Sequence, residues 1–256
     1  MALEEKMDPE IASRWLRASA AFVWLATGVA VLHPHYREVG LAHLEPLGLG
    51  AWIMWATCAL EVVLAIRVAL GASATWLVVG QIVLVAAFSL ILAISEPMLL
   101  VHPMGVLTKN VTFVAVLIAA WMLEREGWSA RAHWVLRFGI AFIWFTEGLF
   151  PKILFQQEME LAIARNHPLV PIDPSLFLTL LGAAQAGSGV LVLLLRGRLL
   201  RWLLFVQGAA LIVLPLLVSW DDMLHWVHPF GPLTKTAPIV VGTFVLASAL
   251  RQEESS

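Results

Sequence analysis

One eight-residue phrase occurs twice in this chain, each time directly before an apolar segment. Residues 102–109, here named phrase 1, read His-Pro-Met-Gly-Val-Leu-Thr-Lys, and residues 228–235, phrase 2, read His-Pro-Phe-Gly-Pro-Leu-Thr-Lys. Six of the eight positions are identical. Because recurrence of this kind indicates a duplicated structural unit, we expect two repeats, residues 1–128 and residues 129–256, each with one phrase near its end.

The composition points to a lipid bilayer as the surroundings of this chain. Only 13% of the residues are charged and 60% are hydrophobic, whereas about a quarter are charged in an average soluble protein. A membrane-spanning helix needs about 20 mainly apolar residues. We therefore expect an all-α integral membrane protein with eight transmembrane helices, near residues 14–32, 49–68, 74–94, 106–123, 133–150, 175–195, 199–219 and 234–250.

The basic residues predict how the chain is oriented. With the amino terminus inside, eleven Lys and Arg residues fall on the inner side and five on the outer side, which agrees with the positive-inside rule. The same orientation places seven of the eight histidines outside. We expect a multi-pass protein of the cell inner (cytoplasmic) membrane with both termini cytoplasmic and with its candidate site on the outer side.

The repeat extends beyond the phrases. Arg17, Trp24 and Gly28 match residues 120 positions later, and Gln81 matches Gln207 at an offset of 126. Four spans per half give both halves the same orientation in the membrane. We therefore expect two four-helix bundles in a parallel repeat, related by a pseudo-twofold axis along the membrane normal.

Each phrase combines a turn with residues that can bind a ligand. Proline ends the preceding helix, glycine permits a tight turn, and a threonine hydroxyl can cap the next helix. In the structural interpretation the lysine snorkels to water or phosphate. In the functional interpretation, His102 with Lys109 and His228 with Lys235 surround one shared outer pocket that favours an anion or a quinone oxygen.

The outer histidines leave a metal or haem site open as a hypothesis. His33 and His35 are two residues apart, His225 and His228 could share a helical face, and His102 could approach His228. Neutral imidazoles bind copper, zinc and iron, and two facing imidazoles can hold haem. The alternative is that these histidines cap helices and contact lipid headgroups.

Polar residues within the predicted spans are further candidates. Glu61 and Glu147 would be costly at membrane depth unless they face the protein interior and a partner. Glu147 could pair with Lys152 or with a phrase lysine, whereas Glu61 aligns with Gly187 and has no matching acid. Gln81 and Gln207 could bond across helices or bind a ligand.

Some kinds of chemistry are not supported by the sequence. Cys58 is the only cysteine, so a disulfide within the chain or a redox pair of cysteines cannot form. The chain has no phosphate-binding loop, no dinucleotide fingerprint and no basic stripe. We therefore expect neither nucleotide nor nucleic-acid partners, and any redox work would need a quinone, a haem, a metal or a partner protein.

One segment carries a family resemblance. Phe-Ile-Trp-Phe-Thr-Glu-Gly-Leu-Phe-Pro-Lys at residues 142–152, followed by Glu158 and Glu160, together with both phrases resembles the DoxX-like family of four-span membrane proteins. The resemblance covers nearly the whole chain as two fused units. It is clearer in the second half, because Thr27 and Leu32 occupy the positions of Glu147 and Lys152 in the first half. The resemblance implies membrane subunits of quinone-linked or thiol-linked oxidation.

These observations favour a redox-associated membrane protein that binds a quinone-like or metal/haem ligand in an outer-leaflet pocket between the repeats. It would be a quinone-linked oxidoreductase or a subunit of one, with a redox partner protein. The alternative is a non-catalytic transporter or a scaffold for a partner protein. The candidate catalytic residues are Glu147, Lys152, His102 and His228; the candidate ligand-binding residues are Lys109, Lys235, Gln81, Gln207 and Glu61; and the candidate metal ligands are His33, His35, His225 and His228.

We also expect the two phrases to be equivalent in structure but unequal in function. Only the second half supplies Glu147 and Lys152 beside its phrase. The sequence therefore predicts a single asymmetric site in the outer half of the membrane.

Overall fold

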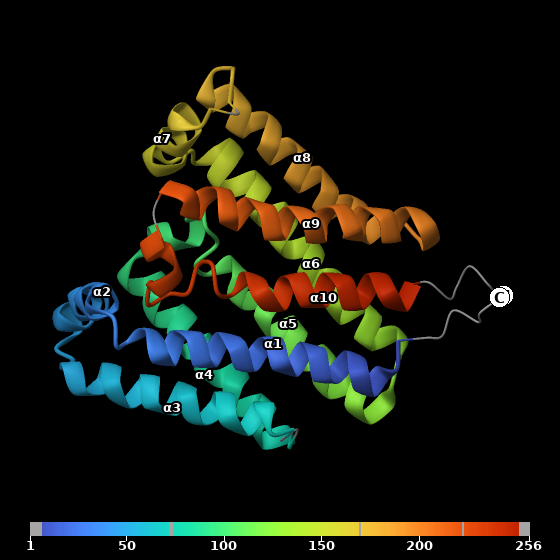
Figure 1. Cartoon of the computed structure of the whole chain (residues 1–256), viewed down its shortest axis with the longest axis horizontal. Helices are drawn as coiled ribbons and strands as arrows, with labels where there is room; N and C mark the ends of the chain where they lie inside the picture. Colours follow the sequence, from blue (N-terminus) through green and yellow to red (C-terminus); the bar gives the residue numbers. More distant parts are fainter. Residues whose placement is uncertain (1–6, 72–73, 169, 222, 251–256) are drawn as a thin grey trace.

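The computed structural model describes residues 7–71, 74–168, 170–221 and 223–250, and this part of the chain is helical without strands. Eight long helices form the molecule (Figure 1). They are α1 (Pro9–Ala30), α3 (Ala51–Ala69), α4 (Thr75–Ser95), α5 (Thr108–Glu126), α6 (Ala130–Leu149), α8 (Pro174–Leu194), α9 (Gly197–Asp221) and α10 (Thr236–Ala249).

Two shorter helices, α2 (Pro34–Leu44) and α7 (Glu158–Asn166), turn away from the long ones. The axis bends by 88° between α1 and α2, and by the same angle between α6 and α7. Both short helices lie at the same end of the molecule (Figure 1). Short helical turns, η2 (Pro97–Val101) and η4 (Met223–Val227), precede the two phrases.

Local sequence determines where several helices begin and end. Asp173 accepts a hydrogen bond from the Leu176 amide at 2.9 Å, and Pro174 fits the first turn of α8. Pro151 lacks an amide hydrogen, and the end of α6 widens there into a π-turn, η3 (Phe150–Leu154). This turn directs Lys152 into the interior of the protein, where its side chain is buried.

The predicted helices are present, but the number of membrane spans is not established by their lengths. Among the described residues, α3, α4, α8 and α9 are each long and apolar enough to cross a membrane, and the bent pairs α1–α2 and α6–α7 would raise the number to six. Helix α10 has only 14 residues, or about 21 Å, because phrase 2 occupies the place where its outer part would lie. Eight spans therefore remain a prediction.

The two halves share one hydrophobic core. Its fully buried members include Leu16 from α1, Leu136 and Ile140 from α6, and Ile239 from α10. Helices α3 and α4 flank this centre in the first half, as α8 and α9 do in the second. The division at residue 128 and the pseudo-twofold axis stay predictions.

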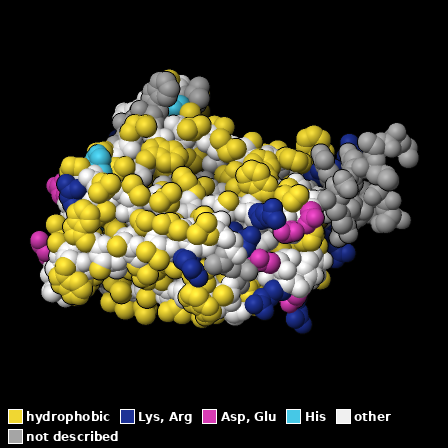
Figure 2. All heavy atoms as spheres, turned by 60° about the horizontal axis from the view of Figure 1, so that its bottom comes forward, with side chains coloured by type: hydrophobic (Ala, Val, Ile, Leu, Met, Phe, Trp, Pro, Cys, Tyr) yellow, Lys and Arg dark blue, Asp and Glu magenta, His cyan; other side chains and the backbone are white. Residues whose placement is uncertain are grey.

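The outer surface is apolar, as a bilayer requires. Trp52, Val83, Leu194 and Trp202 are each at least 60% exposed and lie on the flanking helices. On the face drawn in Figure 2, hydrophobic side chains cover most of the surface and charged side chains gather near one end. Helix α1 begins and α10 ends at the same end of the molecule (Figure 1), although this does not assign that end to the cytoplasm.

Glycines bring α6 and α8 into backbone contact. A Cβ atom on Gly148 would lie 2.4 Å from the Ala186 nitrogen, and one on Gly189 would lie 2.6 Å from the Phe145 nitrogen. Gly187, two residues before Gly189, faces open space. The two helices can therefore approach only along this glycine face.

We expect Gly148→Ala to lower the thermal unfolding midpoint in detergent, because the added methyl group meets backbone atoms that cannot move aside. Overpacking of this kind costs about 1–3 kcal/mol. Gly187→Ala is the matched control and should leave the midpoint unchanged or slightly raised. Equal midpoints for the two variants would contradict the close contact of α6 with α8.

Candidate functional site

The two phrases form the same turn. The Gly105 amide donates to the His102 carbonyl and the Gly231 amide donates to the His228 carbonyl, both at 2.9 Å. Each glycine has a positive φ, 65° and 54° respectively, which favours glycine at this position. The expected structural equivalence of the phrases is therefore observed in the backbone.

Each phrase histidine stabilises its own turn. The Nδ1 atom of His102 accepts from the Met104 amide at 3.2 Å, and that of His228 accepts from the Phe230 amide at 3.3 Å. Burial lowers the pKa of both imidazoles to about 4, so both are neutral near pH 7. These two histidines therefore stabilise the turns of the phrases and cap neither α5 nor α10.

The threonines, by contrast, do not cap the helices as we expected. The Thr108 hydroxyl donates to the Glu147 carboxylate, and the Thr234 hydroxyl donates to the Gly231 carbonyl at 3.3 Å. Helix α5 begins without a side-chain cap. Thr108 was missed as a site residue because its partner lies 39 positions away in the sequence.

The phrase lysines cross between the two halves. Lys109 donates from Nζ to the Pro232 carbonyl at 2.7 Å and to Thr236 Oγ1 at 3.1 Å. Lys235 donates from Nζ to the Val106 carbonyl at 3.3 Å. Pro232 and Val106 occupy the same position of the two phrases. The prediction that these lysines snorkel outward is wrong, because their ammonium groups bond inside the protein.

Five of the candidate residues, namely Lys109, Glu147, Lys152, Glu61 and Lys235, are divided between two cavities and do not line the one shared pocket that we expected. Cavity A has a volume of about 410 Å³ and lies mainly among α6, α7, α8 and α9. Cavity B has a volume of about 220 Å³ and lies mainly among α1, α2, α3 and α4. Phrase 1 borders cavity A and phrase 2 borders cavity B, and Leu233 of phrase 2 also lines cavity A. Each cavity is therefore lined in part by the phrase of the opposite half. His102 and His228 line neither.

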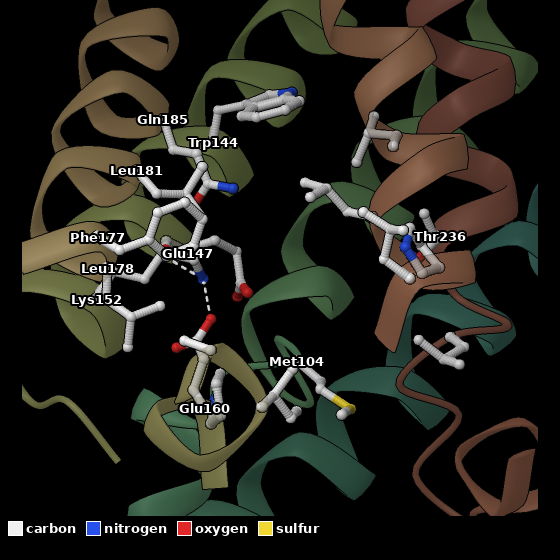
Figure 3. A pocket seen from close by; sticks show the side chains of 18 of the residues that line it. Met104, Trp144, Glu147, Lys152, Glu160, Phe177, Leu178, Leu181, Gln185 and Thr236 are labelled. Atoms are coloured by element: carbon white, nitrogen blue, oxygen red, sulfur yellow. Dashed lines mark hydrogen bonds and ion pairs between the residues drawn. The ribbon is translucent and has the colours of Figure 1, made fainter. Parts of the chain in front are cut away.

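Five ionisable residues border cavity A. They are Lys109, Glu147, Lys152, Glu160 and His167. Lys152 pairs with Glu160 of α7 at 2.8 Å (Figure 3), and its Nζ also donates to the Glu147 carbonyl at 3.4 Å. The expected ion pair of Glu147 with Lys152 is therefore not formed. Glu160 is instead the partner of Lys152, and Lys109 acts on Glu147 only through its nearby charge.

Cavity A also has polar atoms without partners. Among the described residues, Trp144 Nε1, Gln185 Oε1 and Glu160 Oε2 are buried and form no hydrogen bond. All three residues line cavity A. Buried polar atoms are nearly always bonded. Three unpaired atoms around one cavity therefore indicate a place where a ligand can bind.

The equivalent tryptophan in the first half is bonded. Trp24 Nε1 donates to Gln81 Oε1 at 2.8 Å and joins α1 to α4. In the second half, Trp144 Nε1 and Gln207 Oε1 both lack partners, although Gln207 bonds Ser188 across α8 and α9 at 3.0 Å. Gln81 and Gln207 line neither cavity. Both glutamines form hydrogen bonds between helices. Of the two roles considered, bonding across helices and ligand binding, they therefore have the first.

The structure also corrects the match proposed for Glu61. A Cβ on Gly28 would meet the Cys58 carbonyl and the Val62 nitrogen, whereas one on Gly148 would meet the Gly182 carbonyl and the Ala186 nitrogen. This correspondence aligns Glu61 with Gln185 and not with Gly187. Each cavity therefore has one carboxylate that comes from a long helix. This is Glu61 of α3 in cavity B and Glu147 of α6 in cavity A.

The histidines do not form the metal site that we considered. No three His, Cys, Asp or Glu residues come together for a metal ion within the described part of the chain. His33 Nδ1 accepts from the His35 amide at 3.2 Å, and the ring centres of His35 and His228 are 6.1 Å apart. His225 lies in η4. The structure therefore does not show the histidine metal site that we considered among the described residues.

We expect Glu147→Gln to destabilise the protein, because it removes one of two negative charges that balance Lys109 and Lys152. Breaking a buried charge balance costs about 3–5 kcal/mol. The unfolding midpoint in detergent should fall, whereas Glu45→Gln in the exposed outer loop should leave it unchanged.

The double variant Glu147→Gln/Lys109→Met restores the balance of charge. Its loss in free energy of unfolding should therefore be smaller than the sum of the losses in the two single variants. Strict additivity of the two substitutions would exclude electrostatic coupling between Glu147 and Lys109.

Comparison with known families agrees with this geometry. The sequence profile described as the DoxX-like family matches the chain twice, at residues 21–118 and 141–244. The two matched segments correspond to the two halves. Together they include Glu147, the equivalent tryptophans Trp24 and Trp144, and the phrase lysines Lys109 and Lys235. No curated protein and no solved structure matches the chain.

Proposed function

The chain belongs to the DoxX-like family, and from this premise we propose that it is an integral membrane protein that binds a quinone-type ligand in cavity A. The observation that carries the proposal is the group of unpaired polar atoms at Trp144, Gln185 and Glu160. These atoms border a cavity whose other walls are largely apolar, with Phe177, Leu178 and Leu181 on α8 (Figure 3). A quinone carbonyl can accept from Trp144 Nε1, and the hydroxyls of the reduced quinol can donate to Gln185 Oε1 and Glu160 Oε2, so a ring that cycles between these two forms matches the combination.

The balance of charge supports a neutral ligand. Lys109 and Lys152 are matched in number by Glu147 and Glu160 around cavity A. An added anion would therefore bring an uncompensated charge into a buried site, which is costly. This argues against the anion expected from the lysines alone and favours the uncharged carbonyl oxygens of a quinone.

The residues around cavity A can then be given roles. Trp144 would donate from Nε1 to one ligand oxygen, and Gln185 Oε1 would accept from a hydroxyl of the reduced ligand. Thr108 orients the Glu147 carboxylate, which would hold or release a proton at the ligand. A bound quinone supplies two-electron redox chemistry, and we propose that the electrons come from a redox partner protein, with this chain as the quinone-binding subunit.

The surroundings of cavity A also suit a ligand with an apolar tail. Leu211, Leu214 and Pro215 of α9 face α8 across the cavity. Both helices carry exposed apolar residues on their outer faces, such as Leu180 and Leu216. A tail that leaves the cavity would therefore enter an apolar layer without crossing a polar barrier.

We expect Trp144→Phe to weaken binding of a short-chain quinone about tenfold, because one hydrogen bond worth about 1.4 kcal/mol is lost while the ring is kept. The measurement is isothermal titration of purified protein in detergent. Trp24→Phe is the matched control, since the Trp24 indole is bonded to Gln81; it should bind quinone with unchanged affinity. Unchanged affinity in Trp144→Phe would refute the assigned role.

A simpler test uses the protein as purified. Mass spectrometry of its lipid extract should detect a co-purifying quinone, at a level reduced in Trp144→Phe. An extract without quinone, combined with no heat of binding on titration, would instead favour the transporter or scaffold.

We further propose that the phrases lie on the outer side of the inner (cytoplasmic) membrane and that both termini are cytoplasmic. The excess of basic residues on the opposite side supports this orientation. Leu100 in η2 and Met223 in η4 are exposed beside the phrases, and Cys58, the native cysteine, is buried.

We therefore expect Leu100→Cys and Met223→Cys to react with a membrane-impermeant thiol reagent in intact cells. Arg198→Cys at the opposite end should react only after the membrane is permeabilised. If either of the first two variants needed permeabilisation, the two phrases would not share the outer side.

A further inference from the structure

Cavity B has the features of a second binding site with its own selectivity. Its walls include the rings of Trp24, Phe88, Phe113 and Phe230. At one side lie Glu61 from α3 and Lys235 from phrase 2. The quinone proposal does not use any of these residues.

Two polar groups in cavity B, on Glu61 and Lys235, can form further hydrogen bonds. Glu61 is 7% exposed, and its Oε2 atom is buried without a hydrogen-bond partner. The Lys235 ammonium has three N–H groups, of which one donates to the Val106 carbonyl. A ligand hydroxyl placed between these groups could accept from Lys235 and donate to Glu61.

Charge and size restrict what cavity B can hold. Glu61 and Lys235 balance each other, so a neutral ligand is favoured over an ion. A cavity of about 150 Å³ binds one benzene ring, and cavity B, at about 220 Å³, has room for one ring with a substituent. Aromatic walls favour an aromatic ring through edge and face contacts.

We propose that cavity B binds a neutral, single-ring phenol, with its hydroxyl between Lys235 and Glu61. Each cavity is bordered by the phrase of the opposite half, so cavity B is the counterpart of cavity A. It has a smaller volume, and its carboxylate comes from a different helix. Its occupant differs accordingly from the quinone proposed for cavity A.

Fluorine NMR of the purified protein with 4-fluorophenol tests this proposal. The unmodified protein should give a saturable bound signal and should bind fluorobenzene, which lacks the hydroxyl, at least tenfold more weakly. Glu61→Gln should weaken 4-fluorophenol binding at least tenfold. Trp144→Phe, which alters cavity A without changing its charge, should leave that affinity unchanged.

A third variant tests the location without changing the charge. Thr57→Met fills cavity B from α3 and should abolish the bound signal while quinone binding persists. Equal binding of fluorobenzene and 4-fluorophenol, loss of binding in Trp144→Phe, or persistence of the signal in Thr57→Met would each overturn the proposal. The comparison of the two probes uses unmodified protein, so it remains decisive even if a variant fails to fold.

Discussion

Inside a bilayer, a charged group must find its partners within the protein, and the crossed lysines are how this chain meets that requirement. Lys109 bonds the carbonyl of Pro232, and Lys235 bonds that of Val106. These bonds hold the two phrases against each other where the two halves meet. Each cavity is bordered by a phrase, and α10 is short because it begins only after phrase 2 ends.

Much of the fold could be predicted from the sequence, because long apolar runs and a repeated phrase are local signals. The positions of all eight long helices agree with the predicted spans, and the family assignment is confirmed. The phrase turns were also predictable, since proline and glycine restrict the backbone in known ways. The right-angled helices α2 and α7 were not foreseen, because a break in a helix does not specify the direction of the next one.

The site was harder to predict because its contacts join distant segments. The hydrogen bonds of Thr108 with Glu147 and of Lys109 with Pro232 join segments far apart in the sequence. No local sequence pattern predicts such pairs. Glu160 could have been chosen, since it follows the segment that carries the resemblance, but sequence proximity favoured Glu147 as the partner of Lys152. The match of Glu61 with Gly187 failed because loop lengths differ between the halves, whereas the glycine contacts of α1 and α6 give the true correspondence.

The difference between the halves is concentrated at a few positions. Trp24 and Gln81 bond each other, which closes the first half around its smaller cavity, whereas Trp144 and Gln207 leave the larger cavity of the second half with an unused donor. The shared backbone turns are unaffected by this difference. The two cavities therefore differ in their side chains although the two phrases share one backbone turn.

The crossing of the lysines also has a consequence for how such a protein could arise. A single four-helix unit with one phrase has a buried lysine whose carbonyl acceptor belongs to another unit. Such a unit would be stable only as a pair, with two identical cavities. Joining the two copies in one polypeptide fixes the stoichiometry and lets each copy mutate independently, so that one ancestral pair of equal sites can become two sites of different size.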